Sequence, residues 1–81
     1  MRIISQNSIY NLPYDSIIIR REEKTIQART ITGENYFLGR YSTEKKAEHV
    51  FNQILVQTYN IYGNSYRLPK DEWVKLNSEE E

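Results

Sequence analysis

Residues 41–62 read YSTEKKAEHVFNQILVQTYNIY, and this stretch decides the fold. Apolar side chains and one threonine recur in it at helical spacing, which places them on one stripe of an α-helix: Ala47, Val50, Phe51, Ile54, Leu55, Thr58, Ile61 and Tyr62. Phe51 and Leu55 lie at the middle of this stripe, whereas Val56 lies opposite it. The pattern therefore predicts a long helix of roughly twenty residues with one face on a core.

Residues at both ends of this stretch suit the limits of a helix. Ser42 or Thr43 can cap the start, because a hydroxyl oxygen there accepts a hydrogen bond from a free N–H of the first turn. Gly63 can end the helix, because glycine readily takes the left-handed conformation found at helix C-termini.

Strand-forming segments separated by turns precede the helix. Strands are predicted at residues 2–5, 9–11, 16–22, 25–31 and 35–41. Pro13 lacks an N–H, so residues 12–15 must form an edge or a connection. Gly33 is the residue expected at positive φ in the last turn before the helix. Short loops then make residues 16–41 a three-stranded antiparallel meander.

The segment after the helix predicts two smaller elements. Residues 65–68 can add an edge strand, and residues 70–76 can form one more turn that lays Trp73 and Leu76 on the core. The sequence therefore predicts an α+β fold, in which an antiparallel β-meander of three to five strands carries one long α-helix across one face.

The alternation of side chains assigns the two faces of the sheet. Ile26, Ala28 and Thr30 are expected to face the helix, because Gln27 and Arg29 alternate with them. The uncovered face is expected to carry both charged and apolar side chains: Arg20, Arg29, Arg40, Ile18, Ile31 and Leu38. Apolar side chains left in water on such a face indicate that something covers it.

Length and composition bound the class of protein. The chain has 81 residues, eleven basic and eleven acidic side chains and no cysteine. We expect a single α+β domain at residues 1–76 and a disordered acidic tail at residues 77–81. No signal-peptide pattern is apparent in residues 1–20, and the longest apolar run, residues 17–19, is far too short to span a membrane. These features predict a soluble, cytoplasmic protein.

Three short sequence motifs occur together in this chain. They are MRIISQ at residues 1–6, LPY at residues 12–14 and YSTEKKAEHVF at residues 41–51. In this combination the chain resembles small uncharacterised proteins of Gram-positive bacteria, their phages and mobile elements. Those proteins often have an acidic residue where Lys45 stands, which would complete a capping box from Ser42. The resemblance implies a mobile-element origin and offers no catalytic residue.

Metal and catalytic sites are not expected. The chain has one histidine, and its carboxylates do not cluster in metal-binding patterns. His49 falls on the outer face of the helix, where no nucleophile stands near it in the sequence. We therefore expect no enzyme, no cofactor and no metal.

Two binding surfaces remain as candidates. A protein-binding surface would gather tyrosines near the end of the helix with one exposed aliphatic side chain: Tyr10, Tyr14, Val56, Tyr59, Tyr62 and Tyr66. A nucleic-acid-binding surface would combine arginines and a stacking ring on the sheet: Arg20, Arg29, Tyr36 and Arg40.

The first surface is favoured over the second. We expect a non-catalytic accessory or regulatory factor that occludes or bridges a host protein, with self-association into a homodimer as a natural way to cover the second sheet face. A small nucleic-acid-binding protein is the alternative.

Overall fold

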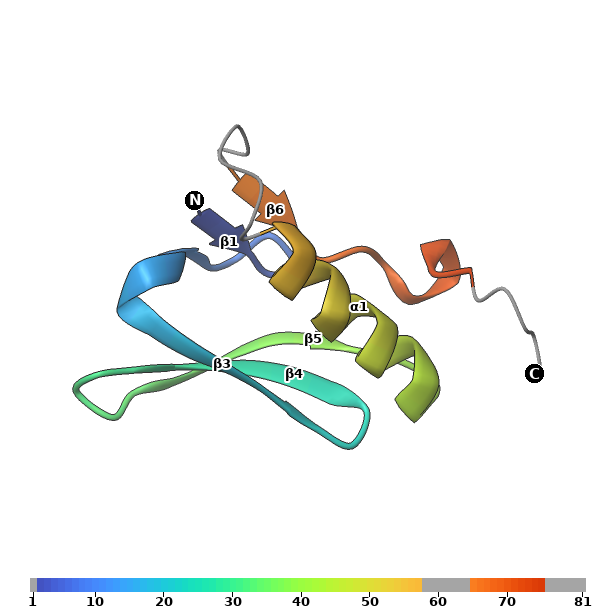
Figure 1. The fold of residues 1–81 in the computed structure, drawn as a ribbon, viewed down its shortest axis with the longest axis horizontal. Helices are drawn as coiled ribbons and strands as arrows, with labels where there is room; N and C mark the ends of the chain where they lie inside the picture. The colour runs from blue at the N-terminus through green and yellow to red at the C-terminus, as the bar shows by residue number, and fades with distance from the viewer. Residues whose placement is uncertain (1, 58–64, 76–81) are drawn as a thin grey trace.

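The computed structural model describes residues 2–57 and 65–75, and Figure 1 shows one helix packed between two small sheets. The strands and the helix are β1 (Arg2–Ile4), β2 (Asn11–Pro13), β3 (Ile17–Glu22), β4 (Thr25–Thr30), β5 (Asn35–Arg40), α1 (Glu44–Gln57) and β6 (Ser65–Arg67). Two short 3₁₀ turns, at Tyr14–Ser16 and Asp71–Trp73, complete the described elements. The predicted α+β fold is confirmed.

The principal sheet is the predicted antiparallel meander, in the order β3-β4-β5. A two-residue loop joins β3 to β4, and Glu23 in this loop has a positive φ of 55°. Gly33 has a φ of 93° in the turn between β4 and β5, as the sequence predicts. Tight turns of this kind need positive φ, and they join neighbouring strands as antiparallel hairpins.

The second sheet has the order β2-β1-β6, with β1 antiparallel to β2 and parallel to β6. The partner predicted at residues 9–11 lies instead at Asn11–Pro13, so that Ile3 pairs with Leu12. The reason is a wide turn, in which the Ser5 hydroxyl oxygen accepts the N–H groups of Ile9 and Tyr10. Pro13 lies in an edge strand, which its missing N–H requires.

Helix α1 begins where the sequence predicts, but its buried face is rotated. The Lys46 N–H donates to the Thr43 hydroxyl oxygen at 3.1 Å, so Thr43 is the cap. Ala47, Val50 and Ile54 are fully buried, whereas Leu55 is 42% exposed, so Leu55 does not lie at the middle of the stripe. Ala47, Val50 and Ile54 recur at helical spacing and define the buried stripe, and Leu55 lies at its margin. The predicted continuation beyond residue 57 and the end at Gly63 lie outside the described residues.

A β-bulge corrects one assignment in β5. Ile26 pairs with Gly39 but Gln27 pairs with Phe37, so Leu38 is an extra residue in β5. The bulge turns both Leu38 and Gly39 toward the core. Leu38, which we expected on the uncovered face, is therefore completely buried.

The core lies between the two sheets and the helix. Its buried apolar members come from both ends of the chain: Ile3, Ile26, Ala28, Leu38, Tyr41, Ala47, Val50, Ile54, Leu68 and Val74. Trp73 was expected here but is 59% exposed, because the 3₁₀ turn at Asp71–Trp73 directs Val74 inward instead. The ammonium of Lys70 lies 5.3 Å from the centre of the exposed Trp73 ring. Leu76 lies outside the described residues.

Candidate functional site

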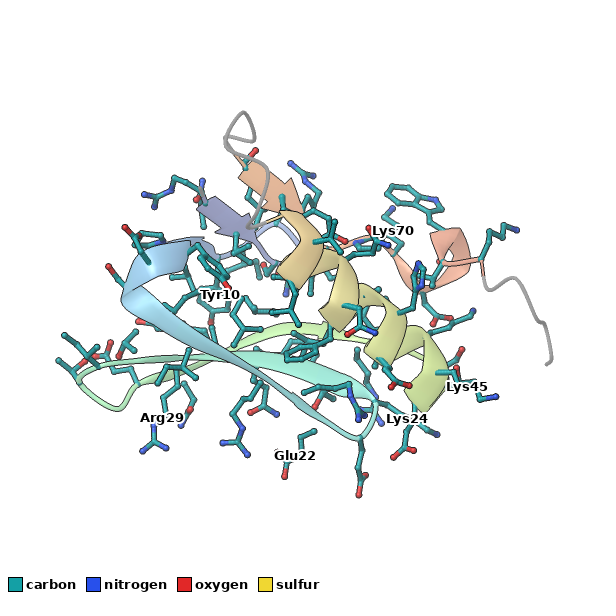
Figure 2. All side chains as sticks on the ribbon, in the orientation of Figure 1. Tyr10, Glu22, Lys24, Arg29, Lys45 and Lys70 are labelled. Atoms are coloured by element: carbon teal, nitrogen blue, oxygen red, sulfur yellow. The ribbon has the colours of Figure 1, made fainter. Side chains whose placement is uncertain are left out.

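The face of the principal sheet that points away from α1 is the strongest candidate surface. We call it the outer sheet face, and its members stand in three cross-strand rows: Ile18, Arg29 and Asn35; Arg20, Gln27 and Phe37; Glu22, Thr25 and Arg40. Helix α1 packs on the opposite side, and Figure 2 shows Arg29 and Glu22 pointing away from it. In the part of the chain that the structure describes, no element covers this face.

Apolar and cationic side chains alternate on the outer sheet face. Ile18 is 63% exposed and Phe37 is 42% exposed, although both belong to residue types that proteins usually bury. Arg20, Arg29 and Arg40 are also exposed and stand one in each row. Each exposed apolar side chain thus has arginine in a neighbouring row.

The charge of this face is positive. Glu22 is its one carboxylate, and its oxygen lies 3.5 Å from a guanidinium nitrogen of Arg20. Both side chains are largely exposed, so the pair contributes little to stability and is easily exchanged for another partner. An open hollow of about 370 Å³ beside Arg40 is lined by Glu22, Glu23, Lys24 and Thr25, and these charges of both signs make it a poor anion site.

Three of the four predicted nucleic-acid-binding residues share this face, and the fourth does not. Tyr36 pairs with the buried Ala28 and packs against the core on the inner side of the sheet. Its hydroxyl donates to Glu34 at 3.0 Å, and this hydrogen bond raises the pKa of Tyr36. Phe37 supplies the aromatic ring of the outer face instead. The sequence of β5 alone does not show this choice, because the pairing register with β4 decides which residues of β5 face outward.

The described members of the predicted protein-binding tyrosines pack against other parts of the fold. The Tyr10 ring meets the Tyr36 ring edge to face, with 5.0 Å between their centres. Tyr14 and Tyr66 are half-buried against the core, and burial raises the pKa of Tyr66. Val56 is 57% exposed, on the outside of the helix as expected. Tyr59 and Tyr62 lie outside the described residues.

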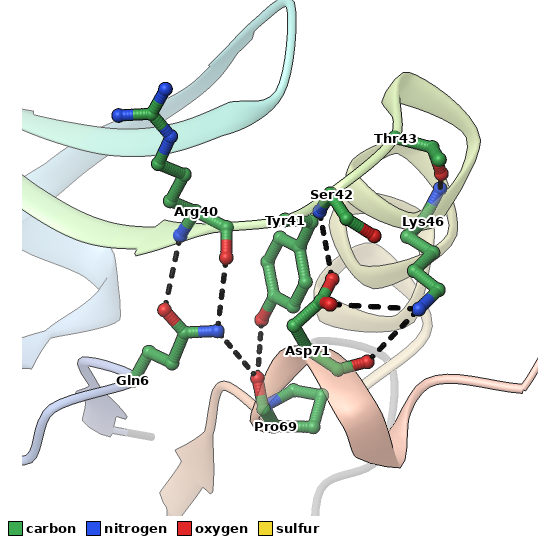
Figure 3. A network of polar contacts seen from close by, with 8 residues as sticks. All are labelled: Gln6, Arg40, Tyr41, Ser42, Thr43, Lys46, Pro69 and Asp71. Atoms are coloured by element: carbon green, nitrogen blue, oxygen red, sulfur yellow. Dashed lines mark hydrogen bonds and ion pairs between the residues drawn. The ribbon is translucent and has the colours of Figure 1, made fainter.

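A hydrogen-bond network closes the β5 edge of the principal sheet (Figure 3). The Gln6 N–H donates to the Leu38 carbonyl oxygen, and the Gln6 side-chain amide bonds the backbone of Arg40. The Pro69 carbonyl oxygen accepts both the Gln6 amide and the Tyr41 hydroxyl, at 3.1 and 2.7 Å. Burial raises the pKa of Tyr41, so this hydroxyl stays a donor. At Leu38 and Arg40 the edge beyond β5 is therefore occupied by the protein itself.

The described residues form no candidate metal site. No group of three or more His, Asp or Glu side chains in residues 2–57 and 65–75 could hold a metal ion. His49 is exposed on the helix surface. The described part of the chain also contains no helix with the length and apolar character needed to cross a membrane.

The comparisons with known proteins give no relative. No protein-family model, no curated protein and no solved structure matches this chain.

Proposed function

We propose that this protein is a non-catalytic protein-binding factor and that the outer sheet face is its binding surface. The observation that carries the proposal is the exposure of Ile18 and Phe37 on one sheet face among three arginines. Aromatic residues and arginine are enriched in protein interfaces, and buried aromatic anchors often supply most of the binding energy. Such a surface binds by complementarity of shape and charge, and it needs no catalytic group.

The biological setting that we propose rests on the sequence resemblance alone. It is an accessory or regulatory factor of a phage or mobile element that occludes or bridges a host protein in the cytoplasm. A rigid sheet face supports this role, because a sheet holds its side chains in fixed positions and loses little freedom on binding.

Capture from a host lysate tests the proposal. The tagged wild-type chain should enrich a host protein, and a double variant with Ile18→Ala and Phe37→Ala should lose that enrichment. Val56→Ala is the matched control, because the exposure of Val56 lies between those of Ile18 and Phe37 but Val56 is on the helix. The proposal fails if the double variant, folded by circular dichroism, captures the same proteins as the wild type.

A second copy of the chain is another way to cover the outer sheet face. Light scattering across micromolar concentrations would then report a mass near twice 9.7 kDa. If the same double variant is monomeric at all these concentrations, the outer sheet face is the contact between copies and the protein partner is the chain itself.

Nucleic-acid binding is the second candidate function, and the observation that favours it is Phe37 standing between arginine-bearing rows. On an open sheet an aromatic ring can stack on the bases of single-stranded nucleic acid, and the cations can neutralise its phosphates. We expect only weak binding at low salt, because Glu22 and the acids of the hairpin loops reduce the positive potential. Sub-micromolar binding that is lost when Arg20, Arg29 and Arg40 are all replaced by Gln would make this the function.

A further inference from the structure

The two edges of the principal sheet differ. At the β5 edge, Gln6 bonds Leu38 and Arg40, as described above. At the β3 edge, no other described strand pairs with Ile17–Glu22 on the side away from β4. An edge strand with unpaired N–H and C=O groups is a template for another strand, and proteins usually protect such edges.

The backbone groups that point out from the β3 edge can be identified. Thr30 pairs with Ile17, but its N–H donates to the Glu34 carbonyl oxygen on the β5 side. Because antiparallel pairs alternate, Ile17, Ile19 and Arg21 therefore direct their backbone groups away from β4. The Ile17 N–H donates to the Tyr14 carbonyl oxygen.

Five backbone groups consequently remain open at this edge. They are the carbonyl oxygen of Ile17 and both the N–H and the carbonyl oxygen of Ile19 and of Arg21. Within residues 2–57 and 65–75, no hydrogen bond to these five groups is formed. They are enough to hold a short strand along β3.

We propose that an extended acidic segment of the partner protein adds to the β3 edge as a fourth, antiparallel strand. This inference rests on the proposed function and names the chemistry of its partner. Main-chain hydrogen bonds would supply affinity and alternate side chains would supply specificity, as in other complexes that form by strand addition.

The side chains of β3 indicate which residue types such a segment must contain. Ile17 and Ile19 are half-buried at the margin of the core, and Ile18 is exposed on the outer sheet face, so all three favour apolar neighbours. Arg20 and Arg21 follow them and are exposed on opposite faces, so both favour carboxylates. Read antiparallel to β3, the complementary segment has two acidic residues followed by three apolar residues.

Charge favours an acidic partner over a second copy of this chain. The described residues hold all eleven basic side chains but eight of the eleven acidic ones, because the other three are residues 79–81. Pairing β3 with itself about Ile19 or Arg20 would set arginines beside isoleucines or beside each other. An acidic segment instead gives each arginine a carboxylate.

Hydrogen exchange of the full chain with a synthetic peptide tests the inference. The probe is acetylated and amidated Gly-Glu-Glu-Val-Ile-Val-Gly, and its control carries Lys in place of both Glu. The acidic peptide should slow exchange of the Ile19 and Arg21 N–H groups at least about tenfold, as new hydrogen bonds require. The Ile18 and Arg20 N–H groups already bond β4 and should change little. Absence of this pattern, or equal protection by the lysine peptide, overturns the inference.

A pair of variants at one position separates the backbone from the charge. Arg21→Pro removes an N–H that points away from β4, which an edge strand tolerates. Arg21→Gln loses the same charge but keeps that N–H. Peptide affinity should fall only a few-fold in Arg21→Gln, since one exposed ion pair is lost, and should be abolished in folded Arg21→Pro. Equal affinities of the two variants contradict strand addition, and the protection pattern in the wild type still decides if Arg21→Pro does not fold.

Two further outcomes are informative. Protection of Ile19 and Arg21 that rises with protein concentration without peptide would show a second copy at this edge and overturn the acidic partner. A host protein that is lost by the Ile18→Ala and Phe37→Ala double variant but retained by Arg21→Pro would support the proposed function and refute strand addition. A host protein retained by the double variant would refute the proposed function itself.

Discussion

The side-chain amide of Gln6 hydrogen-bonds both backbone polar groups of Arg40 and so acts as a short piece of strand beside β5. Its Nε2 donates to the Arg40 carbonyl oxygen at 3.2 Å, and its Oε1 accepts the Arg40 N–H at 3.1 Å. The same Nε2 donates to the Pro69 carbonyl oxygen at 3.1 Å. One side chain thus joins the principal sheet to the segments before β2 and after β6 (Figure 3).

Gln6→Glu should destabilise the protein, because a carboxylate of the same shape cannot donate to the carbonyl oxygens of Arg40 and Pro69. Loss of these hydrogen bonds, with the carbonyl oxygens now facing a negative charge, should lower the free energy of unfolding by about 1–3 kcal/mol in urea melts at pH 7. Gln27→Glu is the control, since the Gln27 amide donates only to the Thr25 hydroxyl, at 3.2 Å, and its loss should cost under about 0.5 kcal/mol. Equal losses at the two positions would show that the Gln6 contacts do not stabilise the fold.

Gly39→Ala should also destabilise the protein, although replacing a glycine within a strand usually increases stability. A Cβ at Gly39 would lie 3.0 Å from a methyl carbon of Leu68, and 3.4 Å from both Gln6 and Tyr41. Leu68 and Tyr41 are buried and cannot easily move. We expect about 1–3 kcal/mol of destabilisation by overpacking in thermal or urea unfolding. An unchanged midpoint would mean that Leu68 has room to shift.

The elements of this fold were largely predictable because each has a local cause. The β3-β4-β5 meander follows from the turns around Glu23 and Gly33 and from the alternation of Ile26 and Ala28 with polar residues. The helix start follows from the Thr43 cap. These are interactions between neighbours in the chain, which a sequence pattern records directly.

Features that depend on distant residues were not predictable. The bulge at Leu38 turns two consecutive residues, Leu38 and Gly39, toward the core, and β6 pairs in parallel with β1 across most of the sequence. Neither leaves a periodic signal in its own segment. For the same reason we predicted from the sequence that Tyr36 lies beside the arginines, whereas the pairing of β5 with β4 presents Phe37 on the outer sheet face.

The rotated face of α1 gives a third prediction. Ile54→Ala should lower the free energy of unfolding by about 2–5 kcal/mol, because Ile54 is fully buried and its loss leaves a cavity. Val56→Ala should cost less than about 0.5 kcal/mol, since Val56 lies on the outside of the helix. Leu55→Ala should fall between them, as its 42% exposure indicates. Urea unfolding of the three variants measures the order, and a larger loss at Leu55 than at Ile54 would contradict the helix orientation.

The last prediction concerns pH and the contact between Asp71 and the start of α1. The Asp71 carboxylate accepts the Ser42 N–H at 2.8 Å and lies 3.6 Å from the Lys46 ammonium. The hydrogen bond from Ser42 is the main cause that lowers the pKa of Asp71, and the Lys46 charge acts in the same direction. Because the folded state favours the ionised carboxylate, this contribution to stability is fully present above the ordinary aspartate pKa of about 4 and is lost as pH falls through the lower folded value.

Asp71→Asn removes the titrating group and keeps an oxygen that can accept the Ser42 N–H. At pH 7 the wild type should therefore be more stable than the variant, and the difference should shrink below about pH 4 and vanish once Asp71 is protonated in the folded state. Urea unfolding of both proteins at a series of pH values between about 2 and 7 measures this difference, with Glu72→Gln as the control at the exposed neighbouring acid. A difference between wild type and Asp71→Asn that stays constant across this range would show that the Asp71 carboxylate is no more favourably placed in the folded protein than in the unfolded chain.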